Sequence, residues 1–256
     1  MKFLVSNDDG IFAHGIDVLE RAARPLGDVW VVAPDREQSA TSHSLTVHHP
    51  LRPTKRDDTH WQVDGTPTDC VMLAIEALLP ERPDFVLSGV NHGQNLGEDV
   101  LYSGTVAAAM EGLALGVPSI AFSFAGGDLR ADKNMLDGQV ELITQLLRHF
   151  ASLQNFPKHT LLNVNLPPRA GSEVRGIRLT RLGRRVFSQS LHPMKDPWGR
   201  PIYWIGGGLA TWDETIGDSD IRAIQEGFVS ITPLHLDLTH VTALDQAAEW
   251  WQALSP

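Results

Sequence analysis

Short apolar runs alternate with amphipathic segments over the first two thirds of the chain. The predicted strands lie at 3–5, 28–33, 85–87, 119–124 and 161–166, of which 29–33 is continuously apolar, and shorter candidate strands lie at 45–51 and 61–63. Segments 16–23, 106–115 and 136–150 place their apolar residues at helical spacing. A strand that is apolar throughout is typical of a parallel sheet covered on both faces. The alternation therefore predicts an α/β fold with a doubly wound, mostly parallel sheet.

Two of the predicted helices carry clear end signals. A further helix is predicted to begin at residue 67: Thr66 can cap it, Pro67 suits its first helical position, and Asp69 can reach back to complete a capping box. The helix at 106–115 ends where Gly116 and Pro118 follow. These signals favour helices that start and stop within the connections between strands, as a doubly wound sheet requires.

The alternation of predicted strands and helices does not continue beyond residue 168. Residues 177–179 and 202–204 are predicted β segments, and the loop 187–201 between them is rich in proline, glycine and aromatic residues. We expect this region to form a projecting hairpin arm. Exposed aromatic patches usually mark interfaces, so the arm is predicted to pack on a second subunit. The aromatic residues of this prediction are Phe187, Trp198, Tyr203 and Trp204.

A strand at 228–232 and a helix at 243–254 are predicted to close the chain. We therefore expect one domain over 1–256. Its core covers 1–168, and the arm, strand and helix of 169–256 are predicted to serve oligomerisation.

Composition narrows the possible classes of protein. Apolar residues make up 42% of the chain, which is typical of a globular protein, and the formal net charge of −10 disfavours binding to a nucleic acid duplex. One cysteine, Cys70, cannot form a disulfide framework. No apolar run is long enough to span a membrane, so we expect a cytoplasmic protein. Arg181, Arg184 and Arg185 form a basic cluster that either binds phosphate or is a solvated strand end.

Polar residues follow three of the predicted strands at their carboxyl ends. These residues are Asp8 and Asp9 after the first strand, Ser39 and His43 after the second, and Asn91, His92 and Asn95 after the run at 85–87. Open parallel sheets bind ligands at this edge, where loops distant in sequence converge. The sequence therefore predicts one site made from all three loops, with no role assigned to the two histidines.

Adjacent carboxylates indicate a cation site. Asp8 and Asp9 repel each other unless a cation lies between them. Oxygens of Ser39 and Asn91 would complete a hard shell suited to Mg²⁺ or Mn²⁺. The alternative is that Asp8, Asp9 and Gly10 form only a turn with an Asx hydrogen bond.

The start of the helix at 106–115 indicates an anion site. Ser103, Gly104 and Thr105 offer backbone N–H groups at the positive end of the helix dipole. The alternative is a serine that only caps the helix. Motifs of zinc proteases, α/β-hydrolases, P-loop NTPases and dinucleotide-binding enzymes are missing from the sequence.

Together these motifs resemble the SurE survival-protein family of stationary-phase 5′-nucleotidases. The matching segments are 6–10, 32–39, 65–70, 88–95, 102–106 and 226–234, which follow the family's order over nearly the whole chain. The resemblance implies a Rossmann-like core with a C-terminal β-hairpin arm and terminal helix. It also implies a homodimer that exchanges an element, in some members paired into a homotetramer.

The resemblance further implies a phosphomonoesterase that depends on one divalent metal ion, Mg²⁺ or Mn²⁺, per subunit. Its substrates would be nucleoside 5′-monophosphates, with 3′-nucleotides and short polyphosphate in some members. The family's metal ligands fall on Asp8, Asp9, Ser39 and Asn91, and its phosphate-binding residues on Asn95, Ser103, Gly104 and Thr105.

The expected reaction is attack of an activated water on phosphorus, with Asp8 or Asp9 orienting the water or acting as base. Three alternatives stay open from the sequence. They are a phosphatase that forms a covalent aspartyl-phosphate, a non-catalytic nucleotide or phosphate sensor, and a structural oligomer that works through its arm.

Overall fold

The centre of the molecule is a mixed β-sheet whose strand order is β3-β4-β2-β1-β5-β6-β7-β13-β8. The structure is a computed structural model, and it describes residues 1–126, 129–153, 156–187, 191–205, 210–213 and 215–252. The strands of this sheet are β1 (Lys2–Ser6), β2 (Asp28–Pro34), β3 (Pro53–Lys55), β4 (His60–Val63), β5 (Phe85–His92), β6 (Ser119–Phe124), β7 (Leu161–Leu166), β8 (Ile177–Leu179) and β13 (Val229–Leu234). Strands β4, β2, β1, β5, β6 and β7 are mutually parallel, whereas β3 and β13 run antiparallel to their neighbours β4 and β7.

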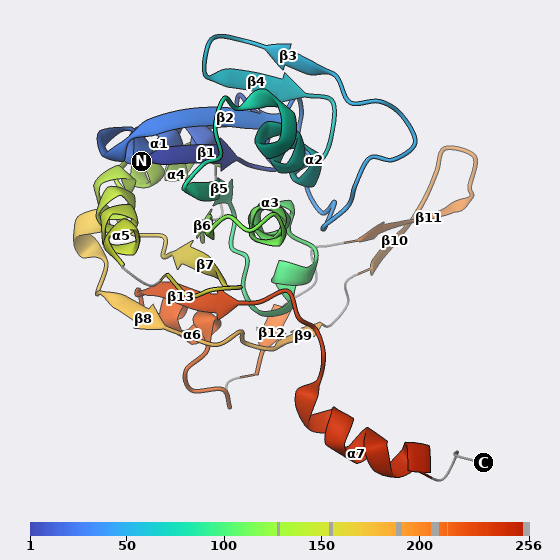
Figure 1. The fold of residues 1–256 in the computed structure, drawn as a ribbon. Coiled ribbons are helices and arrows are strands. Elements are labelled where there is room, and N and C mark those ends of the chain that lie inside the picture. The colour runs from blue at the N-terminus through green and yellow to red at the C-terminus, as the bar shows by residue number, and fades with distance from the viewer. Residues whose placement is uncertain (127–128, 154–155, 188–190, 206–209, 214, 253–256) are drawn as a thin grey trace.

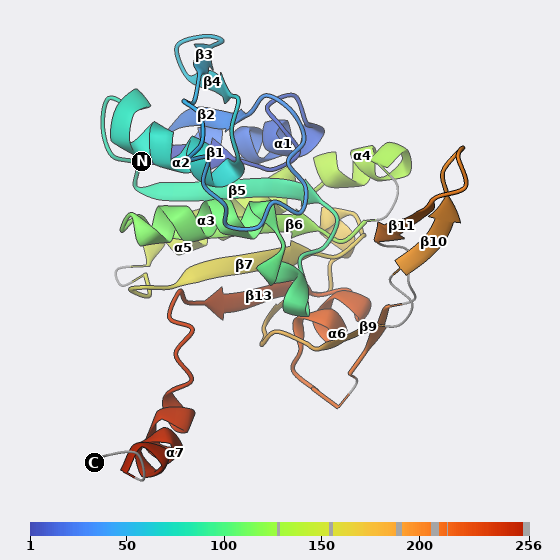
Figure 2. The same ribbon diagram turned by 90° about the vertical axis from the view of Figure 1, so that its right-hand side faces the viewer.

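Helices cover both faces of the sheet, which confirms the predicted doubly wound α/β class (Figures 1 and 2). One face carries α1 (His14–Ala23), α4 (Leu129–Asp137) and α5 (Val140–Ser152), and the other carries α2 (Pro67–Leu73) and α3 (Gly104–Ala114). Strand residues alternate between the two faces, so Phe3 and Val5 pack with the first group of helices and Leu4 packs with the second. Short helical turns η1 (Arg24–Leu26), η2 (Ala74–Leu78), η3 (Gly97–Leu101) and η4 (Gly171–Glu173) complete the connections.

The predicted capping box at the start of α2 is present. Asp69 N donates to Thr66 Oγ1, and Thr66 N donates to Asp69 Oδ2 at 2.8 Å. The neighbouring prediction of a strand at 45–51 is wrong, because this segment does not join a β ladder. It is tied to α2 instead, through Thr46 N to Asp69 Oδ1 at 2.9 Å and through Thr66 Oγ1 to Ser44 O at 2.8 Å.

The predicted helix at 136–150 is two helices in the structure. Helix α4 ends at Asp137 and α5 begins at Val140, with Gly138 between them. Glycine weakens a helix interior, and this break lets each helix take its own direction against the sheet. The expected terminal helix is α7 (Val241–Gln252), and the last residues of that prediction lie outside the described part of the chain.

Beyond the core, a two-stranded hairpin projects from the body (Figures 1 and 2). Strand β10 (Leu191–Lys195) pairs with β11 (Pro201–Ile205). The expected β segment at 177–179 instead joins the main sheet as β8 beside β13. A second small ribbon pairs β9 (Arg185–Phe187) with β12 (Ala210–Trp212). The predicted arm is therefore present, but part of its expected loop is strand β10.

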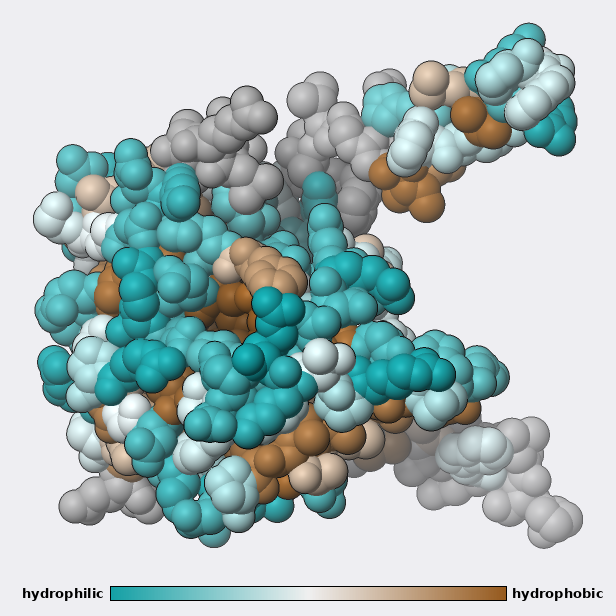
Figure 3. Space-filling view, turned by 90° about the horizontal axis from the view of Figure 1, so that it is seen from above, coloured by the Kyte–Doolittle hydropathy of each residue, from teal (hydrophilic) through white to brown (hydrophobic). Residues whose placement is uncertain are grey.

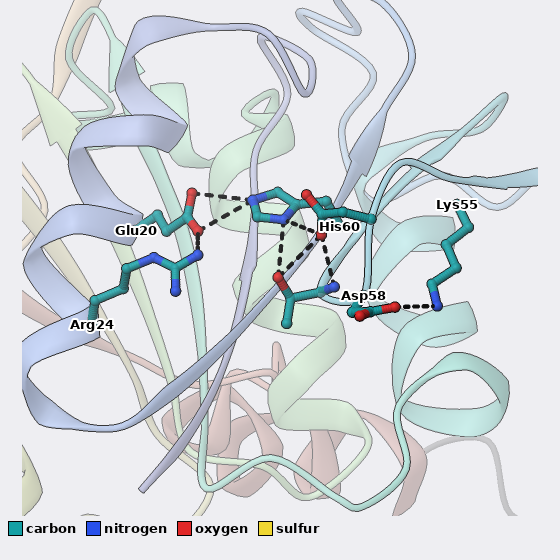
Figure 4. A network of polar contacts seen from close by, with 7 residues as sticks. Glu20, Arg24, Lys55, Asp58 and His60 are labelled. Carbon is teal, nitrogen blue, oxygen red and sulfur yellow. Dashed lines mark hydrogen bonds and ion pairs between the residues drawn. The ribbon is translucent and has the colours of Figure 1, made fainter.

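A polar network fastens the edge of the sheet to α1 (Figure 4). His60 Nε2 on β4 lies 3.2 Å from the Glu20 carboxylate on α1, and His60 Nδ1 lies 2.9 Å from Asp57 Oδ1. Glu20 is also paired with Arg24, one turn further along the chain. These contacts hold β4, the strand next to the edge strand β3, against α1.

The C-terminal part of the chain is joined to the core by a buried carboxylate. Asp220 begins α6 (Asp220–Gln225), and its side chain accepts hydrogen bonds from Gly97 N at 2.9 Å and from Gly183 N at 2.7 Å. Burial raises the pKa of this carboxyl group, although the N–H groups of Gly97 and Gly183 lower it in part. Asp220 thus links three segments that are far apart in sequence.

We expect Asp220→Ala to lower the free energy of unfolding by about 2–4 kcal/mol, because it leaves buried N–H groups without an acceptor. The measurement is urea-induced unfolding followed by circular dichroism. Asp218→Ala is the control: Asp218 forms an exposed ion pair with Arg181, so its loss should cost at most about 1 kcal/mol. Equal destabilisation by the two variants would contradict this role for Asp220.

Candidate active site

A cavity of about 740 Å³ lies at the carboxyl ends of β1, β2, β5 and β6, where the sequence predicts the site. It is lined by Asp8, Asp9, Glu37, Ser39, Ala40, Asn91, His92, Gly93, Gln94, Asn95, Asp99, Tyr102, Ser103, Ala125, Gly126 and Arg185. The structure thus brings together the four predicted metal ligands, together with Asn95 and Ser103. Gly104 and Thr105 do not belong to this lining.

Asp8 is buried and faces the start of α3. Thr105 Oγ1 donates a hydrogen bond to Asp8 Oδ1. Gly104 comes so close that a Cβ atom there would lie 2.7 Å from Asp8 Cβ. Burial raises the pKa of the Asp8 carboxyl, and the hydrogen bonds from Thr105 and Gly104 oppose this shift. The start of α3, predicted as an anion site, therefore surrounds the Asp8 carboxylate.

Ser103 both caps α3 and lines the cavity. Val106 N donates to Ser103 Oγ at 3.0 Å, which is the hydrogen bond of a serine N-cap. The predicted turn after β1 is closed by Asn7, whose Nδ2 donates to Gly10 O at 2.9 Å. The serine cap of α3 is therefore present, and Ser103, Asp8 and Asp9 still line the cavity.

Asp9 is less buried than Asp8. Burial and, secondly, the charge of Asp8 raise the pKa of Asp9 to about 6, and Glu37 acts in the same direction. The backbone N–H of His92, whose nitrogen lies 3.4 Å from Asp9 Oδ2, opposes this shift of the pKa. A cluster of carboxylates with this mutual repulsion favours a bound cation.

The remaining two predicted ligands supply neutral oxygens. Ser39 Oγ donates to Glu37 Oε1 at 2.7 Å, and Asn91 Nδ2 donates to Gly93 O at 2.8 Å. Within the described residues, no group of three or more His, Cys, Asp or Glu side chains is placed to hold a metal ion. Two carboxylates completed by hydroxyl and amide oxygens are a hard donor set, which fits Mg²⁺ or Mn²⁺ better than Zn²⁺.

Asn95 is fixed by a buried network that the sequence analysis missed. Its Nδ2 donates to Ser123 Oγ at 2.8 Å, and its backbone oxygen accepts from Asn163 Nδ2 and Asn165 Nδ2 at 2.9 and 3.1 Å. Asn95 N also donates to Asn165 Oδ1 at 2.9 Å. The available signal was the presence of polar residues inside otherwise apolar strands β6 and β7.

Glu37, Asp99, Tyr102 and Arg185 are further cavity residues that sequence reasoning did not assign to the site. Arg185 belongs to the predicted basic cluster, so the structure places one of these three arginines at the cavity. His43, by contrast, lies outside the lining, and its Nε2 is 2.8 Å from Glu111 Oε2 on α3.

The fold and the site define a doubly wound α/β protein with an acidic, oxygen-rich cavity at the carboxyl edge of its sheet. The chain belongs to the SurE family: the family described as survival protein SurE matches residues 3–189. A 5′-nucleotidase SurE of Gemmatimonas aurantiaca is 68% identical over 252 residues, covering 98% of this chain and 99% of the relative.

Other similar proteins agree with this assignment. A 5′-nucleotidase SurE of Legionella pneumophila (strain Paris) is 48% identical, covering 96% of this chain and 95% of the relative. The crystal structure of the SurE protein from Aquifex aeolicus superposes with a TM-score of 0.83 at 42% identity, covering 96% of this chain and 98% of that one. None of the helices in the described parts of the chain is long and apolar enough to cross a membrane.

If Asp8 is a metal ligand, as the sequence predicts, we expect Thr105→Val to weaken Mn²⁺ binding by about 10–100-fold, because the side chain that orients the Asp8 carboxylate is lost. Thr105→Ser keeps the hydroxyl group and should bind Mn²⁺ nearly as tightly as the wild type. Isothermal titration calorimetry measures both affinities. Equal affinities for the Val and Ser variants would show that the hydrogen bond to Asp8 has no such effect.

Proposed function

We propose that this protein is a 5′-nucleotidase that depends on a divalent cation and releases phosphate from nucleoside 5′-monophosphates. The observation that carries the proposal is the pair of adjacent carboxylates, Asp8 and Asp9, at the edge of a cavity large enough for a nucleotide. Similarity to proteins named 5′-nucleotidase SurE over nearly the full chain supports it. The same chemistry would extend to 3′-nucleotides and short polyphosphate.

Asp8, Asp9, Ser39 and Asn91 would hold the cation. A bound divalent ion supplies charge neutralisation at the phosphoryl group and lowers the pKa of a water molecule. Asp8 is buried and is held by Thr105, whereas Asp9 is less buried at the cavity wall. We therefore assign Asp9 to orient the attacking water, and Asp8 to fix the position of the charge.

Asn95 and Ser103 line the same cavity and are positioned to contact phosphoryl oxygens. Their own positions are fixed, Asn95 by its buried hydrogen bonds and Ser103 by the start of α3. Donors that are already in place can stabilise the negative charge that develops on the phosphoryl oxygens without reorganising. Water attack would then proceed without a covalent intermediate on either aspartate.

The wild-type protein should release phosphate from AMP in the presence of Mn²⁺, and EDTA should abolish the reaction. Asp9→Asn should lower kcat by about 100-fold or more, because it removes a charge at the reacting centre. Asp58→Asn is the control, since Asp58 is an exposed aspartate paired with Lys55. A phosphate-release assay measures all three proteins.

Equal rates with Mn²⁺ and with EDTA would remove the cation from the proposal. Saturable AMP binding without turnover under any divalent ion would instead identify a non-catalytic sensor. A phosphorylated protein trapped during turnover would favour an aspartyl-phosphate mechanism.

We also propose that the chain forms a homo-oligomer through the hairpin β10–β11. Figure 3 shows this hairpin extending from the body with apolar side chains on its surface. Leu191, Met194, Trp198, Tyr203, Trp204 and Ile205 are all exposed there. An aromatic and aliphatic surface of this kind is typical of an interface, and a second copy of this chain is the occupant that we propose.

Sedimentation equilibrium at micromolar concentration should give a mass at least twice the 28.1 kDa of one chain. Ile205→Ser combined with Trp204→Ser should weaken the association, because both side chains are exposed on β11. Val47→Ser removes an equally exposed apolar side chain elsewhere and should leave the mass unchanged. A wild-type monomer would contradict the proposal.

A further inference from the structure

One arginine enters the cavity from the C-terminal part of the chain. Arg185 is the first residue of β9, and it lines the same cavity as Asp8 and Asp9. Among the described lining residues it is the single lysine or arginine, whereas Asp8, Asp9, Glu37 and Asp99 are acidic. These carboxylates would repel a phosphate ester, and a fixed positive charge in the cavity would offset this repulsion together with the proposed cation.

Contacts with Glu98, Asp99 and Trp212 help to set the position of Arg185. Its backbone N–H donates to Glu98 Oε2 at 2.6 Å, and its Nη1 donates to Asp99 Oδ1 at 2.6 Å. Its guanidinium carbon also lies 5.4 Å from the centre of the Trp212 ring. Glu98 and Asp99 belong to η3, which leads directly into Ser103. The guanidinium group is therefore held beside the turn that carries Ser103.

The segment before Arg185 is built into the core. The Asp220 carboxylate binds Gly183 N and Gly97 N together. Gly97 has a φ of +54°, and a Cβ atom there would lie 2.8 Å from Gly183 O. The glycine at 97 therefore lets the two segments approach this closely, and the glycine at 183 leaves room for Ile221, whose Cδ1 would lie 2.1 Å from a Cβ there. Arg185 thus reaches the cavity through buried contacts, and its placement is not that of a mobile surface side chain.

The other members of the basic cluster lie elsewhere. Arg181 is exposed and forms an ion pair with Asp218 at 2.8 Å. Arg184 is also exposed and does not line the cavity. Three arginines close together in sequence are therefore separated by the fold, and Arg184 provides a matched control for Arg185.

We propose that Arg185 is a phosphate-binding residue of this cavity, which contacts phosphoryl oxygens of the substrate and of released inorganic phosphate. The inference rests on the proposed function, which supplies a phosphate monoester as the ligand. A planar guanidinium group can donate two parallel hydrogen bonds to a phosphoryl group, which an ammonium group cannot do. Asp99 then has two opposing effects on phosphate binding. It positions the Arg185 guanidinium group, and its carboxylate also competes with phosphate for the hydrogen bonds of that group.

This arrangement makes a prediction that a purely structural ion pair does not. If Arg185 and Asp99 only stabilise the wall of the cavity, Arg185→Gln and Asp99→Asn remove the same interaction and should shift phosphate affinity in the same direction. If Arg185 binds phosphate, Arg185→Gln removes the donor, whereas Asp99→Asn removes a repelling and competing charge. The two variants should then act in opposite directions.

The test is the dissociation constant of inorganic phosphate, measured by equilibrium dialysis in the presence of Mn²⁺. We expect Arg185→Gln to weaken phosphate binding at least about tenfold, as for the loss of a hydrogen bond between charged groups. Asp99→Asn should tighten binding, Arg185→Lys should give an intermediate affinity, and Arg184→Gln should match the wild type. Circular dichroism checks that each variant is folded.

Kinetics with AMP give a second readout. Arg185→Gln should raise KM and weaken product inhibition by phosphate, while inhibition by adenosine stays unchanged. Weaker inhibition by adenosine alone would place Arg185 on the nucleoside and overturn the proposal. So would unchanged phosphate affinity in Arg185→Gln, a parallel shift in Asp99→Asn, or no phosphate binding by the wild type.

The dialysis result also separates this inference from the proposed function. A wild-type protein that binds phosphate through Arg185 but does not hydrolyse AMP would refute the nucleotidase proposal and support the role of Arg185. If the wild-type protein hydrolyses AMP and the Arg185→Gln variant binds phosphate with normal affinity, the nucleotidase proposal is supported and the role of Arg185 is refuted.

Discussion

The repulsion between two neighbouring carboxylates is the constraint around which the site is arranged. Strand β1 delivers Asp8 and Asp9 to the edge of the sheet, where burial raises the pKa of both and their mutual repulsion adds to the shift of Asp9. The start of α3 opposes this penalty at Asp8, through Thr105 and the close approach of Gly104. The helix N-terminus therefore stabilises a charge of the protein itself, as its dipole and N–H groups allow.

The residues that contact Asp8 differ from the other polar residues that line the cavity. Gly104 and Thr105 contact Asp8 and are not among the residues that line the cavity. Asn95 and Ser103 remain at the cavity wall, and their own hydrogen bonds keep them in place. The residues that orient the carboxylates are thus separate from those that face a ligand, as in sites that depend on outer-shell contacts.

Much of the fold and part of the site follow from the sequence, because local patterns dictate them. Largely apolar runs identified the central strands, and Thr66 and Asp69 identified the start of α2. The predicted strand at 45–51 is wrong because a strand needs a partner strand as well as a suitable pattern, and that segment contacts α2 instead. Asp220 and Asn165 were missed for a related reason: their partners lie 123 and 70 residues away, and only the folded chain brings them together.

The C-terminal part of the chain lacks the regular alternation of strands and helices seen in the core, yet it contributes to both the sheet and the cavity. Strands β13 and β8 extend the sheet beyond β7, and Asp220 joins the segment around Gly183 to η3. Arg185 stands where β9 leaves this buried junction, and the chain continues from β9 toward the hairpin β10–β11. The same stretch of polypeptide therefore forms a wall of the cavity and leads into the arm. The buried hydrogen bonds of Asp220 to Gly97 and Gly183 hold the segment before Arg185 against η3, and so help to place this wall of the cavity.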